Sequence, residues 1–228
     1  MQAAQILLDP KKEFMKALIV HNHWIHYKDL LFREMAAIDR DFLVFFTSRS
    51  STQRFSPPAF GDLPYDSIVG QDGSYEAAKA GVGMRTLWLV LATQNPRLVI
   101  VSGWYDTSAW VAWTWSRLHR RPCIIWAESN QFDKPRSPWK EVLKRIFVRG
   151  CTAAHVYGLS NKAYLVALGM EAEKIFIKRA VVNVDLFRLQ AAKVSEVGVR
   201  KLIFVGRLAP EKNLHLLFRG LVALSVID

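Results

Sequence analysis

Short apolar runs alternate with helix-length segments along most of this chain. The runs predicted as strands are Ala17–His21, Phe42–Thr47, Asp66–Val69, Leu98–Ser102, Cys123–Ala127, Ala153–Tyr157, Ile175–Lys178 and Leu202–Val205. Helical patterns lie between them at Lys28–Ile38, Tyr75–Ala92, Thr107–His119, Pro138–Arg149 and Asn161–Leu168. Strands that are apolar throughout are typical of a parallel sheet with helices on both faces. The sequence therefore predicts a doubly wound α/β fold.

Composition limits the classes of protein to consider. A chain of 228 residues holds one complete domain, or two small ones. Hydrophobic residues make up 51% of it and charged residues 22%, which is a globular composition. The net charge of +11 favours an anionic partner, namely nucleic acid, an anionic membrane surface or a phosphorylated small molecule. Charge alone does not choose among these three.

Several common features are missing from the sequence. Cys123 and Cys151 form neither a C-x-x-C pair nor a zinc-type spacing, so buried free thiols are expected, as in a reducing cytosol. Residues 1–16 lack the apolar core of a secretory signal. The longest apolar stretch, Leu98–Trp115, is interrupted by Asp106. We expect a cytoplasmic protein that does not span a membrane.

The stretch K-L-I-F-V-G-R-L-A-P-E-K-N-L, residues 201–214, predicts a strand that Gly206 ends, followed by a helix from Glu211 to about Val222. Arg207 and Lys212 place two cations beside the start of that helix, an arrangement that suits a diphosphate. An ordinary βα unit with a solvated arginine and lysine explains the same spacing.

The spacing G-R-L-x-P-E-K-N resembles the opening of the donor-binding domain in glycosyltransferase family 4, whose members have the GT-B fold and use nucleotide sugars. The run C-I-I-W-A-E-S-N-Q, residues 123–131, resembles a strand with an "E-S" pattern in a subset of that family. Segments 139–147, 153–158, 160–170 and 174–187 follow the subset in order. The resemblance covers roughly residues 16–222. It implies an acceptor-side Rossmann-like domain (1–182), a linker (183–200) and the first βα unit of an incomplete donor-binding domain (201–228).

The resemblance also implies a function. It implies transfer of a sugar, with retention of configuration, from a nucleotide sugar to a glycan or lipid-linked acceptor, with no cofactor and no essential metal. Gly206, Arg207 and Lys212 would bind the donor diphosphate, and Asp106 and Glu128 would be catalytic. The family's later glutamate-rich motif is not in this sequence, so the activity of these 228 residues is left open. The alternative is a non-catalytic α/β domain, from a truncated gene, that binds an acceptor or a membrane surface.

Polar residues follow three of the predicted strands. His21, Asn22 and His23 end the first, the loop 102–106 follows the fourth, and Glu128 and Ser129 follow the fifth. Since the carboxyl ends of parallel strands meet at one edge, His21, Gly103, Asp106, Glu128 and Ser129 are expected to cluster there. The resemblance implies that His21, Asn22, His23 and Ser129 lie on the acceptor side of the cleft. Other roles explain the same residues. Asp106 is a suitable cap for the helix that follows, and the histidine-rich loop 21–27 is either an exposed loop or a metal site.

Aromatic and basic groups allow two interpretations each. Trp110 and Trp113 are three residues apart on a predicted helix, which favours core packing over a binding platform. Lys140, Lys144, Arg145 and Arg149 fall along one predicted helix. They form either a solvated face or a contact with anionic lipid headgroups, which the family's lipid-linked acceptors make plausible. Nucleic acid binding rests on charge alone and is not expected.

Overall fold

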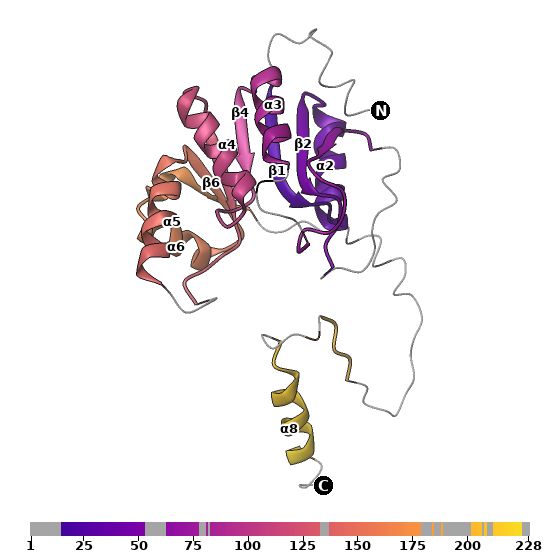
Figure 1. Cartoon of the computed structure of the whole chain (residues 1–228). Coiled ribbons are helices and arrows are strands. Elements are labelled where there is room, and N and C mark those ends of the chain that lie inside the picture. Colours follow the sequence, from indigo (N-terminus) through magenta and orange to yellow (C-terminus); the bar gives the residue numbers. More distant parts are fainter. Residues whose placement is uncertain are drawn as a thin grey trace. The chain divides into compact units, whose positions relative to one another are not determined.

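The computed structural model (Figure 1) describes residues 15–52, 63–77, 81, 83–132, 137–178, 184, 188, 202–206, 208 and 212–224. The chain divides into two compact units, Met1–Asn183 and Val184–Asp228. We call these unit 1 and unit 2 and describe each by itself.

Unit 1 is built on a parallel sheet of seven strands. The strands are β1 (Ala17–His23), β2 (Phe42–Ser48), β3 (Asp66–Val69), β4 (Leu98–Val101), β5 (Cys123–Ala127), β6 (Ala153–Val156) and β7 (Ile175–Ile177). Their order in the sheet is β3-β2-β1-β4-β5-β6-β7, and every neighbouring pair is parallel. The chain therefore adds strands outward in one direction from β1, and then in the other direction from β4.

Helices cover both faces of this sheet. They are α2 (His26–Ile38), α3 (Met84–Gln94), α4 (Thr107–Leu118), α5 (Pro138–Gly150) and α6 (Leu159–Ala167), with a short 3₁₀ helix, η1 (Ala172–Lys174), before β7. Side chains alternate along β1, so Leu18 and Val20 belong to one hydrophobic cluster and Ile19 to the other. The first cluster includes α3, α4, α5 and α6 (for example Phe147), and the second includes Phe32 of α2. The predicted doubly wound α/β fold is confirmed.

The strand order places a crevice between β1 and β4. The connections from these two neighbouring strands run to opposite sides, so their carboxyl ends are not covered by a shared crossover. Gly103 has a φ of +86°, a left-handed conformation that turns the chain away from β4 toward α4. This crevice is where a ligand is expected to bind in an open α/β sheet.

Seven of the eight predicted strands are present, and most bounds differ from expectation by one or two residues. The largest difference in unit 1 concerns the helix predicted from Tyr75, because α3 begins only at Met84. Gly81 and Gly83 have φ values of +87° and +81°, which a continuing right-handed helix does not allow. Trp110 and Trp113 pack against the core as expected, and Trp113 stacks on Phe147 with ring centroids 5.6 Å apart.

Unit 2 does not contain the eighth predicted strand. Residues 202–205 pair with no strand of the described chain and are 38–90% exposed. The following helix, α8 (Leu214–Leu224), starts three residues later than expected. The prediction of a buried strand is wrong here because a single strand has no neighbour to satisfy its backbone hydrogen bonds or cover its side chains.

Candidate functional site

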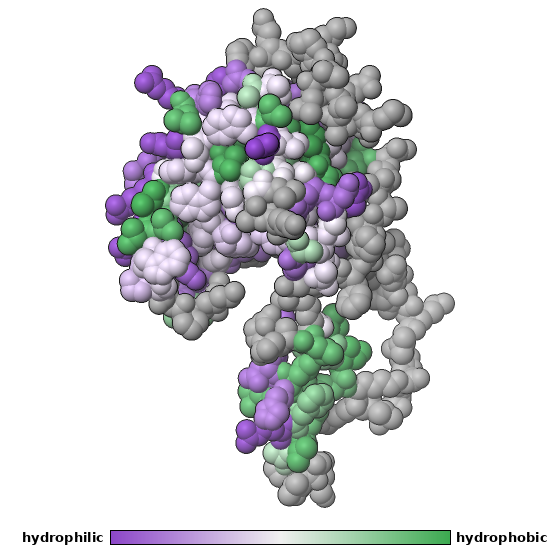
Figure 2. All heavy atoms as spheres, viewed as in Figure 1, coloured by the Kyte–Doolittle hydropathy of each residue, from purple (hydrophilic) through white to green (hydrophobic). Residues whose placement is uncertain are grey.

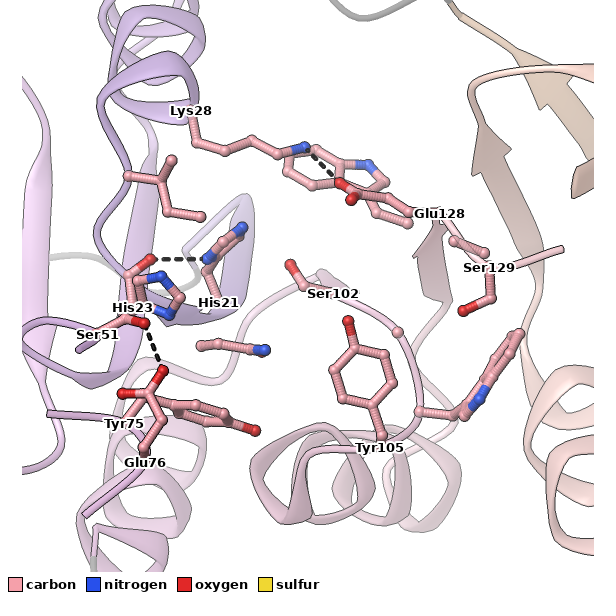
Figure 3. A pocket seen from close by; sticks show the side chains of 16 residues that line it. His21, His23, Lys28, Ser51, Tyr75, Glu76, Ser102, Tyr105, Glu128 and Ser129 are labelled. Atoms are coloured by element: carbon pink, nitrogen blue, oxygen red, sulfur yellow. Dashed lines mark hydrogen bonds and ion pairs between the residues drawn. The ribbon is translucent and has the colours of Figure 1, made fainter. Parts of the chain in front are cut away.

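A pocket of about 250 Å³ lies at the carboxyl ends of β1, β4 and β5 (Figure 3). Its lining comes from five separate segments of unit 1: residues 21–28, Ser51, residues 75–76, residues 102–105 and residues 126–129. Polar side chains share the lining with the rings of Tyr75, Trp104, Tyr105 and Trp126. Such a mixture of flat apolar surface and a few polar groups is characteristic of small-molecule sites.

The end of β1 supplies two buried histidines to the pocket. His21 Nδ1 lies 3.0 Å from the carbonyl oxygen of His23, and since a carbonyl can only accept, Nδ1 carries the proton. In the neutral ring, Nε2 is then a hydrogen-bond acceptor. The ring of His23 lies 5.9 Å from that of Tyr75. Burial, with the charge of Asp106, raises the pKa of Tyr75 to about 12, so this hydroxyl stays protonated and can donate.

Lys28, in the first turns of α2, is a buried cation on the pocket wall. Its side chain is only 5% exposed, and its ammonium lies 3.7 Å from the Glu128 carboxylate and also donates to the Tyr157 hydroxyl. The same nitrogen lies 4.8 Å from the centre of the Trp126 ring. Burial lowers the pKa of Lys28, while Glu128 acts in the opposite direction. The pocket therefore contains a shielded positive charge with one carboxylate partner.

Glu128 and Ser129 follow β5 directly, as the sequence predicts. The side-chain amide of Asn161, on α6, donates to both backbone carbonyls of this pair, at 2.7 Å and 3.1 Å. These two bonds fix the path of the loop. The Glu128 side chain itself is 58% exposed, so its carboxylate can reach a ligand. Figure 3 shows it pointing toward Lys28 across the mouth of the pocket.

The opposite rim is formed by Ser51, Tyr75 and Glu76 (Figure 3). The carboxylate of Glu76 accepts from the Ser51 hydroxyl and, at 2.8 Å, from the Thr52 amide. Burial by itself would raise the pKa of Glu76, but these hydrogen bonds outweigh it and hold the pKa at about 2. Glu76 therefore stays ionised at neutral pH and ties the loop after β2 to the segment after β3.

Ser102, at the end of β4, points its hydroxyl into the pocket (Figure 3). The oxygen is buried and has no hydrogen-bond partner among the described residues. A buried hydroxyl without a partner is costly, and a ligand hydroxyl or a water in the pocket would satisfy it.

Asp106 lies just outside this lining. One carboxylate oxygen accepts from the Ser108 amide at 3.0 Å, which caps α4, and the other lies 3.2 Å from the Thr47 hydroxyl. Asp106 is 6% exposed. The capping role considered in the sequence is therefore present in the structure, and Asp106 anchors the end of the loop 102–105.

The structure brings His21, Asn22, His23, Glu128 and Ser129 together in one pocket, with Gly103. Gly206 and Lys212 belong to unit 2, and Arg207 lies outside the described residues. The sequence patterns did not predict Lys28, Tyr75, Glu76 and Trp126 as lining residues. One signal for Lys28 existed: a lysine near the start of a helix opposes the helix dipole, so it needs another reason to be there.

The described part of the chain contains neither a candidate metal site nor a membrane-spanning helix. In residues 15–52, 63–77, 83–132 and 137–178 and the described parts of unit 2, no group of three or more His, Cys, Asp or Glu side chains could hold a metal ion. Over the same residues, every helix is too short or too polar to cross a membrane.

No protein-family model and no curated protein sequence matches the chain. Solved structures do resemble its fold. UDP-GlcNAc 2-epimerase from Neisseria meningitidis bound to UDP-GlcNAc is 15% identical, the match covering 78% of this chain and 50% of that one, with a TM-score of 0.53. UDP-N-acetylglucosamine 2-epimerase from Rickettsia bellii is 16% identical, the match covering 77% of this chain and 48% of that one, with a TM-score of 0.51. HepE of Anabaena in complex with UDP is 15% identical, the match covering 76% of this chain and 46% of that one, with a TM-score of 0.50.

These likenesses show the fold alone, because the identities are so low. The chain has a Rossmann-like α/β fold, which these solved structures share, and the likenesses do not single out glycosyltransferase family 4. The chain spans about half the length of the solved structures that it matches. The ligands named for those proteins are bound by longer chains, so the likenesses do not assign a ligand to this chain.

Proposed function

We propose that unit 1 is the acceptor-side domain of a nucleotide-sugar-dependent glycosyltransferase that transfers a sugar, with retention, to a glycan or lipid-linked acceptor. The observation that carries this proposal is the pocket between β1 and β4. It combines aromatic rings, on which a sugar ring can stack, with carboxylate, imidazole and hydroxyl groups that can hydrogen-bond sugar hydroxyls. The GT-B-like fold, and the UDP or UDP-GlcNAc that matching proteins bind, support the nucleotide-sugar part.

Within the pocket, Glu128 is our candidate for the group that accepts a hydrogen bond from the attacking hydroxyl. Lys28 holds its carboxylate by an ion pair 3.7 Å long, and Asn161 fixes its backbone. His21 and Ser129 orient other hydroxyls, while Asp106 acts through the loop that it anchors. Arg207 and Lys212 of unit 2 would neutralise the donor diphosphate, which stabilises the leaving group in the transition state, and Gly206 would let the backbone turn beside it.

Two charge-assisted hydrogen bonds, from Arg207 and Lys212, stabilise a complex by roughly 1.5–3 kcal/mol each before the cost of association. Binding at about 1 mM already requires ~4 kcal/mol. The 228-residue chain should therefore bind UDP-sugars no tighter than about 1 mM, and transfer little sugar. The proposal expects a full second domain to restore transfer.

The test is transfer by a protein that carries a complete second domain, measured as UDP release with the anomeric configuration of the product read by NMR. Glu128→Gln should lower kcat by about 100-fold or more, and Arg207→Ala and Lys212→Ala should each remove most activity. Glu171→Gln, at an exposed carboxylate that pairs with Lys174, is the matched control and should leave kcat unchanged. Robust transfer by Glu128→Gln would show that this residue has another role.

A second candidate is a non-catalytic domain that binds a glycan. The exposed, unpaired run 202–205 favours it, because the described part of unit 2 provides no sheet on which a donor could be bound. Titration of the 228-residue chain with oligosaccharides, followed by NMR, separates the two candidates when combined with the transfer assay. Glycan binding without transfer by any extended protein would favour the second.

A further inference from the structure

Helix α5 turns apolar side chains away from the core. The exposed ones are Trp139 (61%), Val142 (52%), Leu143 (42%) and Ile146 (50%), which we call the α5 stripe. Their spacing of three, four and seven residues places them on one helix face. In most globular domains such a face is the buried one. Here Phe147 and Val148 are buried instead, so the stripe is additional to the surface that packs on the sheet.

Positive charge borders the stripe on both sides. At about 100° per residue, Arg145 and Arg149 fall on one flank and Lys140 on the other, and all three are exposed. Lys144, expected on the same basic face, instead points inward and donates to Glu141 at 2.7 Å and to the Tyr164 hydroxyl at 3.0 Å.

The outward surface of α5 carries no negative charge. Glu141, the one acidic residue of the helix, has a side chain that is only 13% exposed and is neutralised by Lys144. In Figure 2, hydrophobic and strongly hydrophilic side chains lie next to one another on the left flank, where Figure 1 places α5.

We propose that the α5 stripe docks onto the surface of an anionic lipid bilayer. A helix that lies in the plane of a bilayer buries an apolar face among the acyl chains and keeps Lys and Arg at the level of the headgroups. The stripe with Lys140, Arg145 and Arg149 has this arrangement. Trp139 adds an indole, a side chain that is enriched at membrane–water interfaces.

Other occupants fit the same surface less well. A second copy of the chain, docked symmetrically, would bring the three cations that flank one α5 stripe near those that flank the other and incur like-charge repulsion. Nucleic acid would satisfy the cations but would leave the apolar centre without a partner, since its outer surface is phosphate.

The position of α5 connects this surface to the pocket. The helix follows β5, so it begins at the same edge of the sheet as Glu128. Lys144 of α5 lies 5.8 Å from the ring centre of Trp104, which lines the pocket. A chain held on a bilayer by α5 would thus present its pocket near the lipid surface. The docking itself does not depend on the proposed transfer reaction.

The test is co-sedimentation of the full chain with vesicles of phosphatidylcholine alone, or with roughly 30 mol% phosphatidylglycerol. We expect at least about tenfold tighter binding to the anionic vesicles, and weaker binding at about 1 M salt, where charges are screened. Val142→Ser/Leu143→Ser/Ile146→Ser should lose at least about tenfold in binding to the anionic vesicles. Arg145→Gln/Arg149→Gln should lose several-fold on anionic vesicles and change nothing on neutral ones.

Two matched controls carry the same kinds of substitution on other helices. Arg85→Gln/Leu89→Ser changes exposed residues of α3, and Leu221→Ser/Leu224→Ser changes exposed leucines of α8; both should bind like the wild type. All substituted side chains are exposed, so thermal unfolding should be unchanged. Equal binding by the α5 stripe variant, loss of binding in the α8 control, or a wild-type dimer that the stripe variant makes monomeric would each overturn the proposal.

Discussion

Two nearly identical apolar runs adopt different structures in this protein. Leu98-Val-Ile-Val101 becomes β4, between β1 and β5, where Val99 and Val101 are completely buried. Leu202-Ile-Phe-Val205 forms no strand, and its residues are 64%, 79%, 38% and 90% exposed. Both runs are followed by a glycine within two residues and then by a helix. The difference lies in the neighbours: β4 has a strand on each side, whereas the second run has none among the described residues.

The lesson is that an apolar run specifies a strand only in the presence of its partners. Intrinsic strand preference amounts to about 1 kcal/mol over the whole scale and depends on context. Backbone pairing and burial stabilise a strand more strongly, and both are supplied by other parts of the chain. Most of the predictions that follow compare a position in unit 1 with one in unit 2.

The largest contrast is expected in amide hydrogen exchange. The amides of Val99, Ile100 and Val101 should open only with global unfolding, which costs about 5–15 kcal/mol in typical domains. Those of residues 203–205 should exchange close to the rate of an unfolded peptide. Mass spectrometry of the two peptides measures this directly. Similar protection in both would show that the second run has found a partner strand.

Next in size is the effect of truncating an isoleucine. Ile125, in β5, is completely buried, so Ile125→Ala should lower the free energy of unfolding by about 2–5 kcal/mol. Ile203 is 79% exposed, and Ile203→Ala should change it by less than about 0.5 kcal/mol. Urea unfolding followed by circular dichroism gives both values. A comparable loss at Ile203 would contradict the exposed state of the run.

Two lysines provide a smaller contrast. Lys28 is buried and Lys212 is exposed. Replacing a buried charge by an apolar side chain is often stabilising, so Lys28→Met should raise the stability of unit 1 by about 1 kcal/mol at neutral pH, while Lys212→Met should have no effect. Thermal unfolding checks both. A destabilised Lys28→Met protein would mean that the ion pair with Glu128 outweighs the cost of burial.

The pH dependence of stability tests the buried lysine independently. Because burial lowers the pKa of Lys28 in the folded state, the unfolded state binds more protons just below 10.5, the ordinary value for lysine. Stability should therefore rise with pH as that value is approached, and Lys28→Met should remove the rise. Tyr75, whose pKa is raised to about 12, acts oppositely only above its ordinary value of 10.0.

The smallest effect is expected in acid. The pKa of Glu76 is about 2 in the folded state against an ordinary 4.5, so its contribution is complete above pH 4.5 and is lost between pH 4.5 and 2. Because Glu76 is exposed, we expect Glu76→Gln to cost about 0.5 kcal/mol at neutral pH. The described residues of unit 2 include no carboxylate, so the α8 helix should not respond over this range. An unchanged acid profile in Glu76→Gln would contradict this role.

Most of the architecture of unit 1 follows from its sequence. Seven runs, most of them apolar, separated by helical patterns become seven parallel strands, because a strand buried on both faces of a sheet needs apolar side chains at successive positions. The same rule predicts that His21 and Glu128 meet at one edge of the sheet. The start of α3 does not follow from the pattern, since Gly81 and Gly83 adopt left-handed backbone conformations that hydrophobic periodicity does not reveal.

The rest of the site depends on contacts between distant segments. Lys28 is at a position where the pattern predicts an ordinary surface lysine, yet it is buried, and its amine lies against the rings of Trp126 and Tyr157. Asp106 is recognisable as a potential cap, but its second contact, with Thr47, comes from β2. Short sequence windows do not contain these contacts between distant segments.

The strand order has a consequence for how the pocket forms during folding. Lys28 follows β1, and its partners Trp126 and Glu128 are in or next to β5, but β4 lies between these two strands in the sheet. The loop that closes when Ala17 pairs with Leu98 is long, and closing such loops slows folding. The amine of Lys28 should therefore stay accessible to an acylating reagent through the early milliseconds of refolding, until β5 has joined β4. The refolding time at which the Lys28 amine becomes protected from acylation would measure when β5 completes the ligand site.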